Sequence, residues 1–417
     1  MGIALKWDIT PRCNFRCPHC CNASYTRGEK GRTPELTLEE IKDLTDKLVE
    51  SKSVTGVTLM GGEPTMRKDL EEIIRYCTEN GIVTQIVSNG SPLTPQRVDS
   101  LLEAGNWGFT ISIDGATPEA YGYTRPPRFF PHLIKHIRYL SDRIHEIRDA
   151  GGPPRNLSLN SLLHKKNRKD AVKMVDLALD LRVDSLSFIP LVMPPDVEDQ
   201  KLTEWQRSYT MDLIPSPEDC LEVAVEIGRR IDLRFNPDMT DLEVQLKFLS
   251  PLVRDYLAVE HDIHLPLIAR ECAAVTRIGS LNHDGTMVIC EALDRSHEAV
   301  EVGAIQARPL SLREQSFWDI WNSDSYQQMF SWVFKEDIYE YMEPCRRCPH
   351  LFKICRPCPE RAIALAATGK KERWAMVICD QVARRVDGDL YALNQRAQAF
   401  LGVPTDQQVA GALARSN

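Results

Sequence analysis

Hydrophobic and polar positions alternate in blocks along the first 190 residues, and each block has the length of a strand or a helix. Nearly continuous apolar runs of strand length occur at 3–9, 54–60, 82–88, 108–113, 156–163 and 185–189. Helical spacing of apolar residues fills the segments between them, over about 37–51, 65–80, 94–104, 130–149 and 167–181. Apolar strands that alternate with helices are typical of a parallel sheet buried on both faces. We therefore predict an α/β fold whose roughly six βα units curl into a partial (β/α)6 TIM-like barrel.

The rest of the chain has a different pattern, which predicts further domains. A core over residues 1–190 is followed by a proline-punctuated helical bridge over 191–270, with amphipathic helices near 217–230 and 241–257. A cysteine-rich domain over 271–380 begins with a hairpin turn at 282–285, and a C-terminal helix and tail cover 381–417.

Composition narrows the class of protein. The 417 residues are 43% hydrophobic and 26% charged, with a net charge of −8 and no lysine- or arginine-rich run. This balance disfavours binding to nucleic acid or to anionic membranes. Neither a transmembrane stretch nor a signal peptide is evident, so we expect a cytoplasmic protein.

The 13 cysteines gather at the two ends of the chain. Without a secretory signal they indicate metal ligation in a reducing cytosol rather than a disulfide framework. Cys77 and Cys220 stand apart on helical segments, and we expect them to be small buried core residues.

The first cysteine cluster has the spacing C-x3-C-x2-C, formed by Cys13, Cys17 and Cys20. Three thiolates on a four-iron cluster leave one iron free to bind a small ligand, whereas a closed zinc site or cluster needs a fourth protein ligand. Cys21 is the alternative fourth ligand, but it is adjacent to Cys20 and its side chain would point away from the same cluster.

This motif resembles that of the radical S-adenosylmethionine (SAM) superfamily. The resemblance implies that the three thiolates hold a [4Fe–4S] cluster whose fourth iron chelates SAM, and that SAM is cleaved to a 5′-deoxyadenosyl radical. Further motifs match at the expected carboxyl ends of strands, where barrel enzymes place their sites. By this resemblance, the SAM-binding residues are Gly61, Gly62, Glu63, Ser88, Ser112, Arg125 and Asn160. Asp114 and His164 are additional polar candidates at the barrel mouth.

The second cysteine array resembles the SPASM extension of radical SAM enzymes, which binds two auxiliary [4Fe–4S] clusters. The resemblance assigns Cys272, Cys290 and Cys358 to a barrel-proximal cluster, and Cys345, Cys348, Cys355 and Cys379 to a distal one. The central spacing is x2, x6, x2 rather than the family's usual x2, x5, x3, which shifts Cys355 by one residue. Zinc knuckles are the alternative for this array, since C-x2-C pairs also suit zinc.

Glu291, directly after Cys290, is the candidate catalytic base, because an acidic residue at the matching position is proposed to accept the substrate proton in anaerobic sulfatase-maturating enzymes. A solvated glutamate at a strand end is the alternative. Auxiliary clusters imply that the substrate radical loses a second electron, so we expect an oxidoreductase supplied by a reductant such as flavodoxin or ferredoxin.

Two substrate classes remain open. Cys13 lies near the start of the chain, so we expect no N-terminal leader-binding domain, and we favour dehydrogenation of a small alcohol such as an aminocyclitol or sugar in natural product biosynthesis. The alternative is a maturase that crosslinks or oxidises a ribosomally made precursor peptide. An iron–sulfur electron carrier is a third hypothesis, but it has no need of the SAM motifs.

Overall fold

The computed structural model describes residues 2–20, 35–191, 212–266, 277–288, 290, 310–339, 342–358 and 377–401. Its centre is a 10-stranded sheet with the order β10-β9-β8-β1-β2-β3-β4-β5-β6-β7. The parallel strands are β1 (Ile3–Thr10), β2 (Val54–Gly61), β3 (Val83–Ser88), β4 (Gly108–Ser112), β5 (Asn156–Leu163), β6 (Ser185–Pro190), β7 (Glu243–Leu246) and β8 (Ile278–Leu281). The remaining strands are β9 (Thr286–Val288) and β10 (Leu310–Ser311), which continue the sheet in antiparallel pairs.

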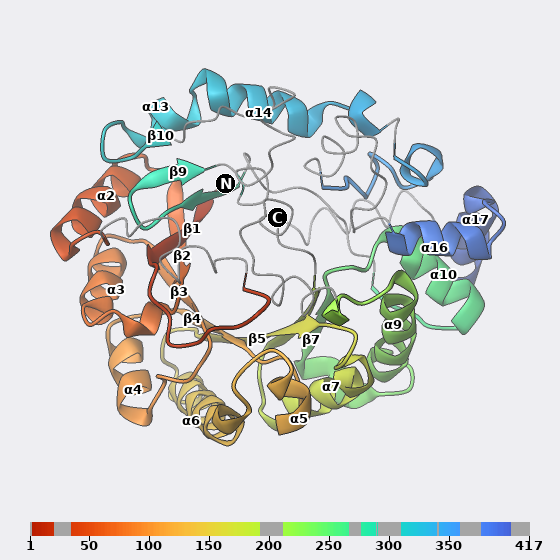
Figure 1. Ribbon diagram of the computed structural model, residues 1–417, viewed down its shortest axis with the longest axis horizontal. Coiled ribbons are helices and arrows are strands. Elements are labelled where there is room, and N and C mark those ends of the chain that lie inside the picture. The colour runs from red at the N-terminus through yellow and green to blue at the C-terminus, as the bar shows by residue number, and fades with distance from the viewer. Residues whose placement is uncertain are drawn as a thin grey trace.

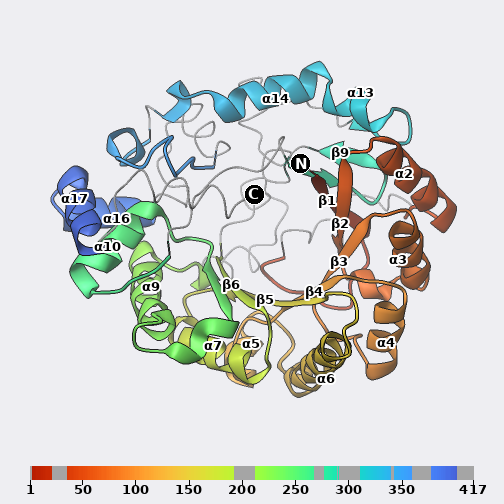
Figure 2. The same cartoon turned by 180° about the vertical axis from the view of Figure 1, so that it is seen from behind.

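Helices cover the outer side of this curved sheet. Figures 1 and 2 show the first strands lining the inside of an arc and the helices that connect them lying outside it. The helices of the first half are α2 (Leu38–Glu50), α3 (Leu70–Glu79), α4 (Pro95–Glu103), α5 (Pro118–Gly122), α6 (Phe130–Asp149) and α7 (Ala171–Asp180). Those of the second half are α9 (Pro217–Ile231), α10 (Pro251–His261), α13 (Phe317–Trp321), α14 (Asp324–Phe334), α16 (Val377–Arg385) and α17 (Leu390–Leu401). The α/β class and the TIM-like partial barrel predicted from the sequence are confirmed.

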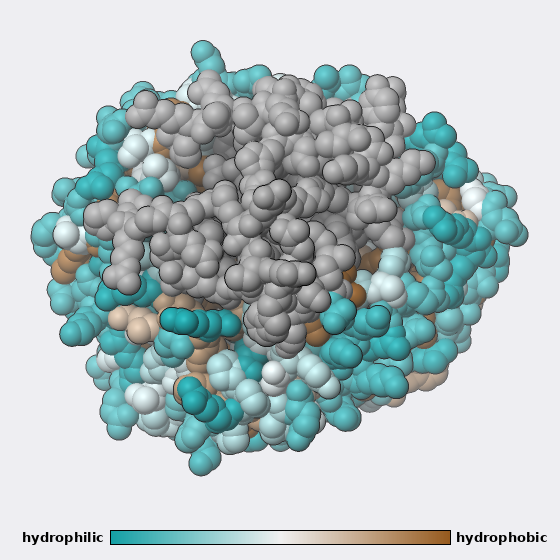
Figure 3. All heavy atoms as spheres, viewed as in Figure 1, coloured by the Kyte–Doolittle hydropathy of each residue, from teal (hydrophilic) through white to brown (hydrophobic). Residues whose placement is uncertain are grey.

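The hydrophobic core lies between the sheet and these helices. Each central strand contributes a large side chain that is almost fully buried, including Trp7, Leu59, Ile86, Phe109 and Leu186. The outer surface is mainly hydrophilic where Figure 3 colours it. Among the described residues, no helix combines the length and the apolar character needed to span a membrane.

Local sequence signals explain several boundaries. Helix α2 begins at a capping box in which the Thr37 hydroxyl accepts the Glu40 N–H at 3.2 Å and the Glu40 carboxylate accepts the Thr37 N–H at 2.8 Å. Cys77 and Cys220 are buried in the core, as expected of small apolar residues. The hairpin predicted at 282–285 joins β8 to β9, and Gly285 has the positive φ of +86° that its turn requires.

The sequence prediction of one helix over 241–257 is wrong. Residues 243–246 form β7, which pairs in parallel with β6 from Ser185↔Glu243 to Phe188↔Leu246. Helix α10 begins only after Ser250, which caps it, with Pro251 at its first position. The sheet therefore has another parallel strand beyond the predicted six, and α10 starts where the bridge meets the C-terminal cysteines.

Candidate functional site

The three N-terminal cysteines lie together on the loop that follows β1, at the carboxyl end of the parallel sheet. Cys13, Cys17 and Cys20 are all half-buried. The Phe15 N–H donates to Cys13 Sγ at 3.4 Å, and the Cys20 N–H donates to the Cys17 carbonyl at 3.3 Å. Burial raises the pKa of the Cys13 thiol, and the nearby Glu63 carboxylate adds to the increase. The loop therefore presents three free thiols on one short stretch of chain.

The Gly61-Gly62-Glu63-Pro64 turn after β2 is joined to the base of this loop by backbone hydrogen bonds. The Gly62 N–H donates to the Thr10 carbonyl at 2.8 Å, and the Glu63 N–H donates to the Arg12 carbonyl at 2.7 Å. A Cβ atom on Gly62 would collide with the Arg12 carbonyl group, and Gly61 has a φ of +126°. Both glycines are therefore needed because the backbone of this turn lies against the backbone at the base of the cysteine loop. This need exists without any bound SAM.

The Glu63 carboxylate connects the ends of β2 and β3. It is fully buried, and its oxygens accept hydrogen bonds from the Ser88 hydroxyl at 2.8 Å, the Asn89 N–H at 2.7 Å and the Thr65 N–H at 3.2 Å. Burial raises the pKa of Glu63, although these donors oppose the increase. Asn89 also donates to Asn14 of the cysteine loop at 2.9 Å. The carboxylate that the sequence assigned to SAM therefore also fixes the loops around the cysteines.

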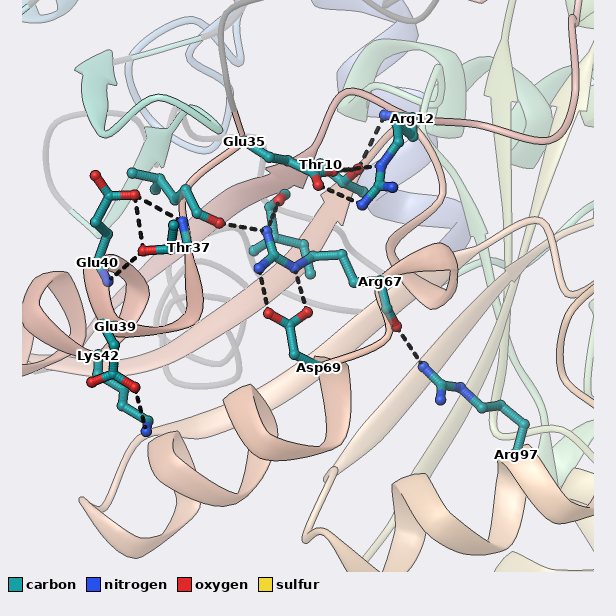
Figure 4. Close-up of polar contacts among 12 residues, drawn as sticks. Thr10, Arg12, Glu35, Thr37, Glu39, Glu40, Lys42, Arg67, Asp69 and Arg97 are labelled. Carbon is teal, nitrogen blue, oxygen red and sulfur yellow. Dashed lines mark hydrogen bonds and ion pairs between the residues drawn. The ribbon is translucent and has the colours of Figure 1, made fainter.

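A buried arginine performs a similar task and gave no signal in the sequence. Arg67 Nη1 donates to the carbonyls of Ile9 at 2.9 Å and Leu36 at 3.0 Å, while Nε and Nη2 form a two-point pair with Asp69 at 2.9 and 2.7 Å. Figure 4 shows this fork, together with Arg97, which donates to the Arg67 carbonyl. Arg67 is charged but only 4% exposed, and its hydrogen bond to Ile9 fixes the end of β1.

A second buried ion pair lies after β4. Arg125 Nε donates to Asp114 Oδ2 at 2.6 Å, the Thr124 hydroxyl donates to the same oxygen at 2.9 Å, and the Leu162 N–H donates to Oδ1 at 2.9 Å. Burial opposes ionisation of Asp114, but the Arg125 guanidinium and the Leu162 N–H hold its pKa below its ordinary value. Arg125 is also near the Cys17 sulfur, whose charge contributes to its raised pKa. The guanidinium predicted to meet the SAM carboxylate is thus already oriented by Asp114.

Ser112 and Asn160 occupy neighbouring strands at the same level. They are register partners across β4 and β5, and the Ile113 N–H donates to the Asn160 carbonyl at 2.9 Å. Both residues are half-buried. The structure therefore brings together two residues that lie 48 positions apart in the sequence. Their role toward SAM stays a prediction.

Three aromatic side chains near Asp114 carry polar atoms without partners. Among the described residues, the Tyr121 hydroxyl, His164 Nε2 and His19 Nδ1 are buried and make no hydrogen bond. Burial lowers the pKa of both histidines to about 4, so each ring is neutral near pH 7. His164 Nδ1 accepts the Lys166 N–H at 3.2 Å, which leaves its proton on Nε2 as a donor. Sequence reasoning named His164 but missed Tyr121 and His19.

Four of the C-terminal cysteines line a separate, partly open cavity. The four cysteines that line it are Cys345, Cys348, Cys355 and Cys379, and the other lining residues are Ser250, Pro251, Leu252, Pro344, His350, Leu351 and Pro357. Cys290 and Cys358, which are also described, are not part of this lining. Of the six described C-terminal cysteines, the cavity lining therefore contains the four predicted for the distal cluster and neither of the two described ones predicted for the proximal cluster.

Four cysteine thiols are the donor set that an iron–sulfur cluster takes. Within the described parts of the chain, no three His, Cys, Asp or Glu side chains converge closely enough to bind one metal ion. The four cysteines line the same pocket, and burial raises the pKa of the Cys348 thiol to about 12. An iron–sulfur cluster bound there would use all four sulfurs as ligands.

A buried polar network supports one wall of the cavity. His350 Nε2 lies 2.7 Å from Asp255 Oδ2, and Asn394 Nδ2 donates to the same carboxylate oxygen at 2.8 Å. Asp255 belongs to α10 and Asn394 to α17, so the network joins the bridge, the cysteine-rich segment and the C-terminal helix.

Two predicted residues and one alternative cannot be placed. Cys272, Glu291 and Cys21 lie outside the described residues. Their predicted roles as a proximal-cluster ligand, a catalytic base and an alternative fourth ligand therefore stay predictions. The domain boundaries drawn from the sequence also stay predictions.

Two protein-family models match the chain. One, described as the radical SAM superfamily, covers residues 7–178, and the other, described as the iron–sulfur cluster-binding SPASM domain, covers residues 272–349. The first contains the N-terminal cysteine loop and every residue that the sequence assigned to SAM. The second contains the start of the C-terminal array.

Relatives of known function share parts or most of the chain. An AdoMet-dependent heme synthase of Methanosarcina barkeri is 27% identical over 371 residues, which cover 88% of this chain and 93% of that protein. A PqqA peptide cyclase of Bradyrhizobium diazoefficiens is 26% identical over 244 residues, or 57% of each chain. The mycofactocin maturase MftC of Mycolicibacterium smegmatis is 32% identical over 140 residues, or 34% of each chain.

Solved structures with the same fold cover most of the chain at low identity. Streptococcus suis SuiB bound to its precursor peptide SuiA has a TM-score of 0.60 and 17% identity, and covers 91% of this chain and 76% of that chain. The structure of anSMEcpe with bound AdoMet has a TM-score of 0.64 and 12% identity, with 100% and 99% covered. At these identities the likeness concerns the fold.

Proposed function

Because the chain belongs to the radical SAM superfamily and carries an iron–sulfur cluster-binding SPASM domain, we propose that it catalyses the oxidative modification of a peptide. Bound [4Fe–4S] clusters and SAM supply the one-electron chemistry that removes a hydrogen atom from a substrate C–H bond. The observation that carries the proposal is the convergence of the cysteine loop, the Gly61-Gly62-Glu63 turn and the Asp114–Arg125 pair at one end of the barrel.

The residues at this end have complementary tasks. Cys13, Cys17 and Cys20 hold the SAM-binding cluster, and the backbone bonds from Gly62 and Glu63 fix the base of their loop. Arg125 is the group whose fork suits the SAM carboxylate, and Asp114 limits its freedom to turn. Ser112 and Asn160, which are register partners on two adjacent strands, would contact the SAM ribose.

The C-terminal cysteines would hold two further clusters, which would supply an acceptor for the second electron of the oxidation. The cavity lined by Cys345, Cys348, Cys355 and Cys379 supports their assignment to the distal cluster. Cys272, Cys290 and Cys358 remain for the proximal cluster, and Glu291 accepts the substrate proton. A flavodoxin or ferredoxin supplies the electron that starts the reaction.

A peptide is favoured as the substrate because relatives named for peptide maturation recur among the similar proteins. PqqA peptide cyclase and MftC are similar in sequence, and the SuiB fold is known with its precursor peptide bound. The small alcohol that the sequence favoured gains no specific support from these relatives.

A heme precursor is the second candidate substrate. The observation in its favour is coverage, because the AdoMet-dependent heme synthase aligns over 88% of this chain whereas the peptide maturases align over smaller parts. Under either proposal the clusters and SAM are the same, and the difference is whether a peptide or a heme precursor enters the mouth of the barrel.

Anaerobic reconstitution tests the proposal. The purified chain, loaded with iron and sulfide and given dithionite and SAM, is expected to release 5′-deoxyadenosine and to contain about 12 irons for three four-iron clusters. Replacement of Cys13, Cys17 and Cys20 by alanine is expected to lower iron to about 8 and to abolish 5′-deoxyadenosine. The matched control, Cys77→Ala, removes a buried core thiol and is expected to leave both unchanged.

The substrate class is tested in the same reaction. A synthetic peptide encoded by a short reading frame beside the gene is expected to lose the mass of two hydrogen atoms, as mass spectrometry would show. A peptide that remains unmodified while a heme precursor is converted would select the second candidate. Failure of the wild-type chain to form 5′-deoxyadenosine would reject both.

A further inference from the structure

Helix α10 begins at the wall of the distal cysteine cavity. Its first residues, Ser250, Pro251 and Leu252, all line the cavity. Ser250 is the N-cap, and its hydroxyl oxygen accepts the Val253 N–H at 3.2 Å. The partially positive end of an 11-residue helix therefore faces the four thiols.

Ser250 also touches one of those thiols directly. Its Oγ lies 3.1 Å from Cys379 Sγ, and both side chains are buried, with Ser250 4% and Cys379 8% exposed. A hydroxyl has one proton to donate and two lone pairs that accept. Because Val253 uses a lone pair, the proton remains available for the sulfur. Once Cys379 is a metal-bound thiolate it has no proton, so Ser250 must be the donor.

This hydrogen bond has a defined electrostatic effect. The reduction potential of an iron–sulfur cluster depends on hydrogen bonds to its sulfur atoms and on exclusion of solvent. One added electron increases the negative charge on the ligand sulfurs, and a donor that points at them stabilises this reduced state. The surrounding Pro344, Leu351 and Pro357 are apolar, so the interaction is not weakened by water.

Two other groups frame the same site with opposite effects. The His350 backbone favours the thiolate form of Cys348 by lowering its pKa, against the increase that burial causes. The Asp255 carboxylate is a nearby negative charge, but it is engaged by His350 and Asn394. Removal of the Ser250 hydroxyl would therefore take a hydrogen-bond donor away from Cys379 Sγ without breaking this network.

We propose that Ser250 is a positioning residue that raises the reduction potential of the distal cluster through its hydrogen bond to Cys379. The inference rests on the proposed function, which assigns that cluster to Cys345, Cys348, Cys355 and Cys379. It goes further by naming the group that makes this cluster a better acceptor for the electron leaving the substrate.

The test is a redox titration of the reconstituted full-length chain followed by electron paramagnetic resonance. The Cys13, Cys17 and Cys20 alanine background removes the first cluster from the spectra. In that background, Ser250→Gly is expected to lower the ratio of reduced to oxidised distal cluster about tenfold at a fixed potential, which is a shift of ~59 mV for one electron. Glycine is chosen because it serves as an N-cap almost as well as serine, so the helix start is preserved.

Two variants act as controls. Ser250→Thr keeps both the hydroxyl and the cap, and is expected to restore the wild-type potential. Ser216→Gly removes the equivalent N-cap hydroxyl of α9, which accepts the Asp219 N–H at 3.0 Å and does not line the cysteine cavity, and it is expected to leave the potential unchanged.

The outcomes separate this inference from the function on which it rests. An unchanged potential in Ser250→Gly with full iron content overturns the role of Ser250 alone, and so does a loss of iron from that variant, because the serine would then serve assembly. If a Cys345→Ala, Cys379→Ala double variant retains all its iron, the assignment of the distal cluster itself fails.

Discussion

Gly62→Ala is expected to disable the N-terminal cysteine loop. The added Cβ would lie 2.5 Å from the Arg12 carbonyl carbon, closer still to its oxygen, and 2.9 Å from the Pro11 carbonyl oxygen. Real Cβ atoms do not approach backbone carbonyls this closely, so the turn and the loop base must move apart.

The size of the destabilisation by Gly62→Ala follows from the contacts that are lost when these two segments move apart. The Gly62 N–H bond to Thr10 and the Glu63 N–H bond to Arg12 are each worth about 0.5–1.5 kcal/mol. Overpacking a site that cannot relax costs about 1–3 kcal/mol more. A destabilisation of roughly 2–6 kcal/mol, concentrated at the base of the loop, is enough to open the loop even while the rest of the sheet stays folded.

Iron content and 5′-deoxyadenosine formation after anaerobic reconstitution measure this effect. Gly62→Ala is expected to lose about four irons per chain and nearly all cleavage of SAM. Gly81→Ala is the matched control, because Gly81 has a φ of +77° but nothing within 4 Å of the added Cβ, so it strains the backbone far from the cysteines. Wild-type iron and activity in Gly62→Ala would refute the reasoning that the turn sets the loop geometry.

Three further changes test other parts of the barrel mouth. Asp114→Asn removes the buried partner of Arg125 and is expected to lower the free energy of unfolding by about 3 kcal/mol at pH 7. Folding lowers the pKa of Asp114, so its contribution to the free energy of unfolding is complete above the ordinary pKa of about 3.9 and is lost as the pH falls through the folded-state pKa. In denaturant unfolding, the difference in free energy between wild type and variant should therefore shrink below about pH 4. Tyr121→Phe deletes a buried hydroxyl that has no hydrogen-bond partner among the described residues, so the chain without its cofactors is expected to melt at an equal or higher temperature while substrate-dependent turnover falls. An unaltered turnover would show that the hydroxyl meets no ligand. Glu291→Gln is expected to keep 5′-deoxyadenosine formation and lose oxidised product, and unchanged product with intact clusters would exclude it as the base.

The barrel could be predicted from the sequence because its strands are apolar on both faces and its helices carry clear boundary signals. The capping box at Thr37 is an example, since both of its hydrogen bonds form as expected. The prediction of one helix over 241–257 was wrong because a four-residue strand is too short to show the alternation of apolar and polar residues that marks a strand. The Ser250-Pro251 pair was a helix-start signal that the prediction did not use.

The cysteines could be found from spacing alone, but the groups that position them could not. Arg67 contacts Ile9 and Leu36, which are 58 and 31 positions away, and such a partner leaves no trace in a local pattern. Tyr121 lies on a short helix where an aromatic residue would ordinarily be interpreted as core. In both cases the tertiary fold, rather than the spacing, brings the polar atom to the site.

The pairing of β1 with β8 has a consequence for synthesis of the chain. Strand β1, which ends at the cysteine loop, is paired on one side with β2 and on the other with residues 278–281, in the register Ala4↔Ile278 to Trp7↔Leu281. Until those residues leave the ribosome, one edge of β1 has no partner, and unpaired edges are sites of misassociation. A fragment that stops before residue 277 would keep the first three cysteines but leave that edge open, so the N-terminal barrel should be produced together with its C-terminal extension.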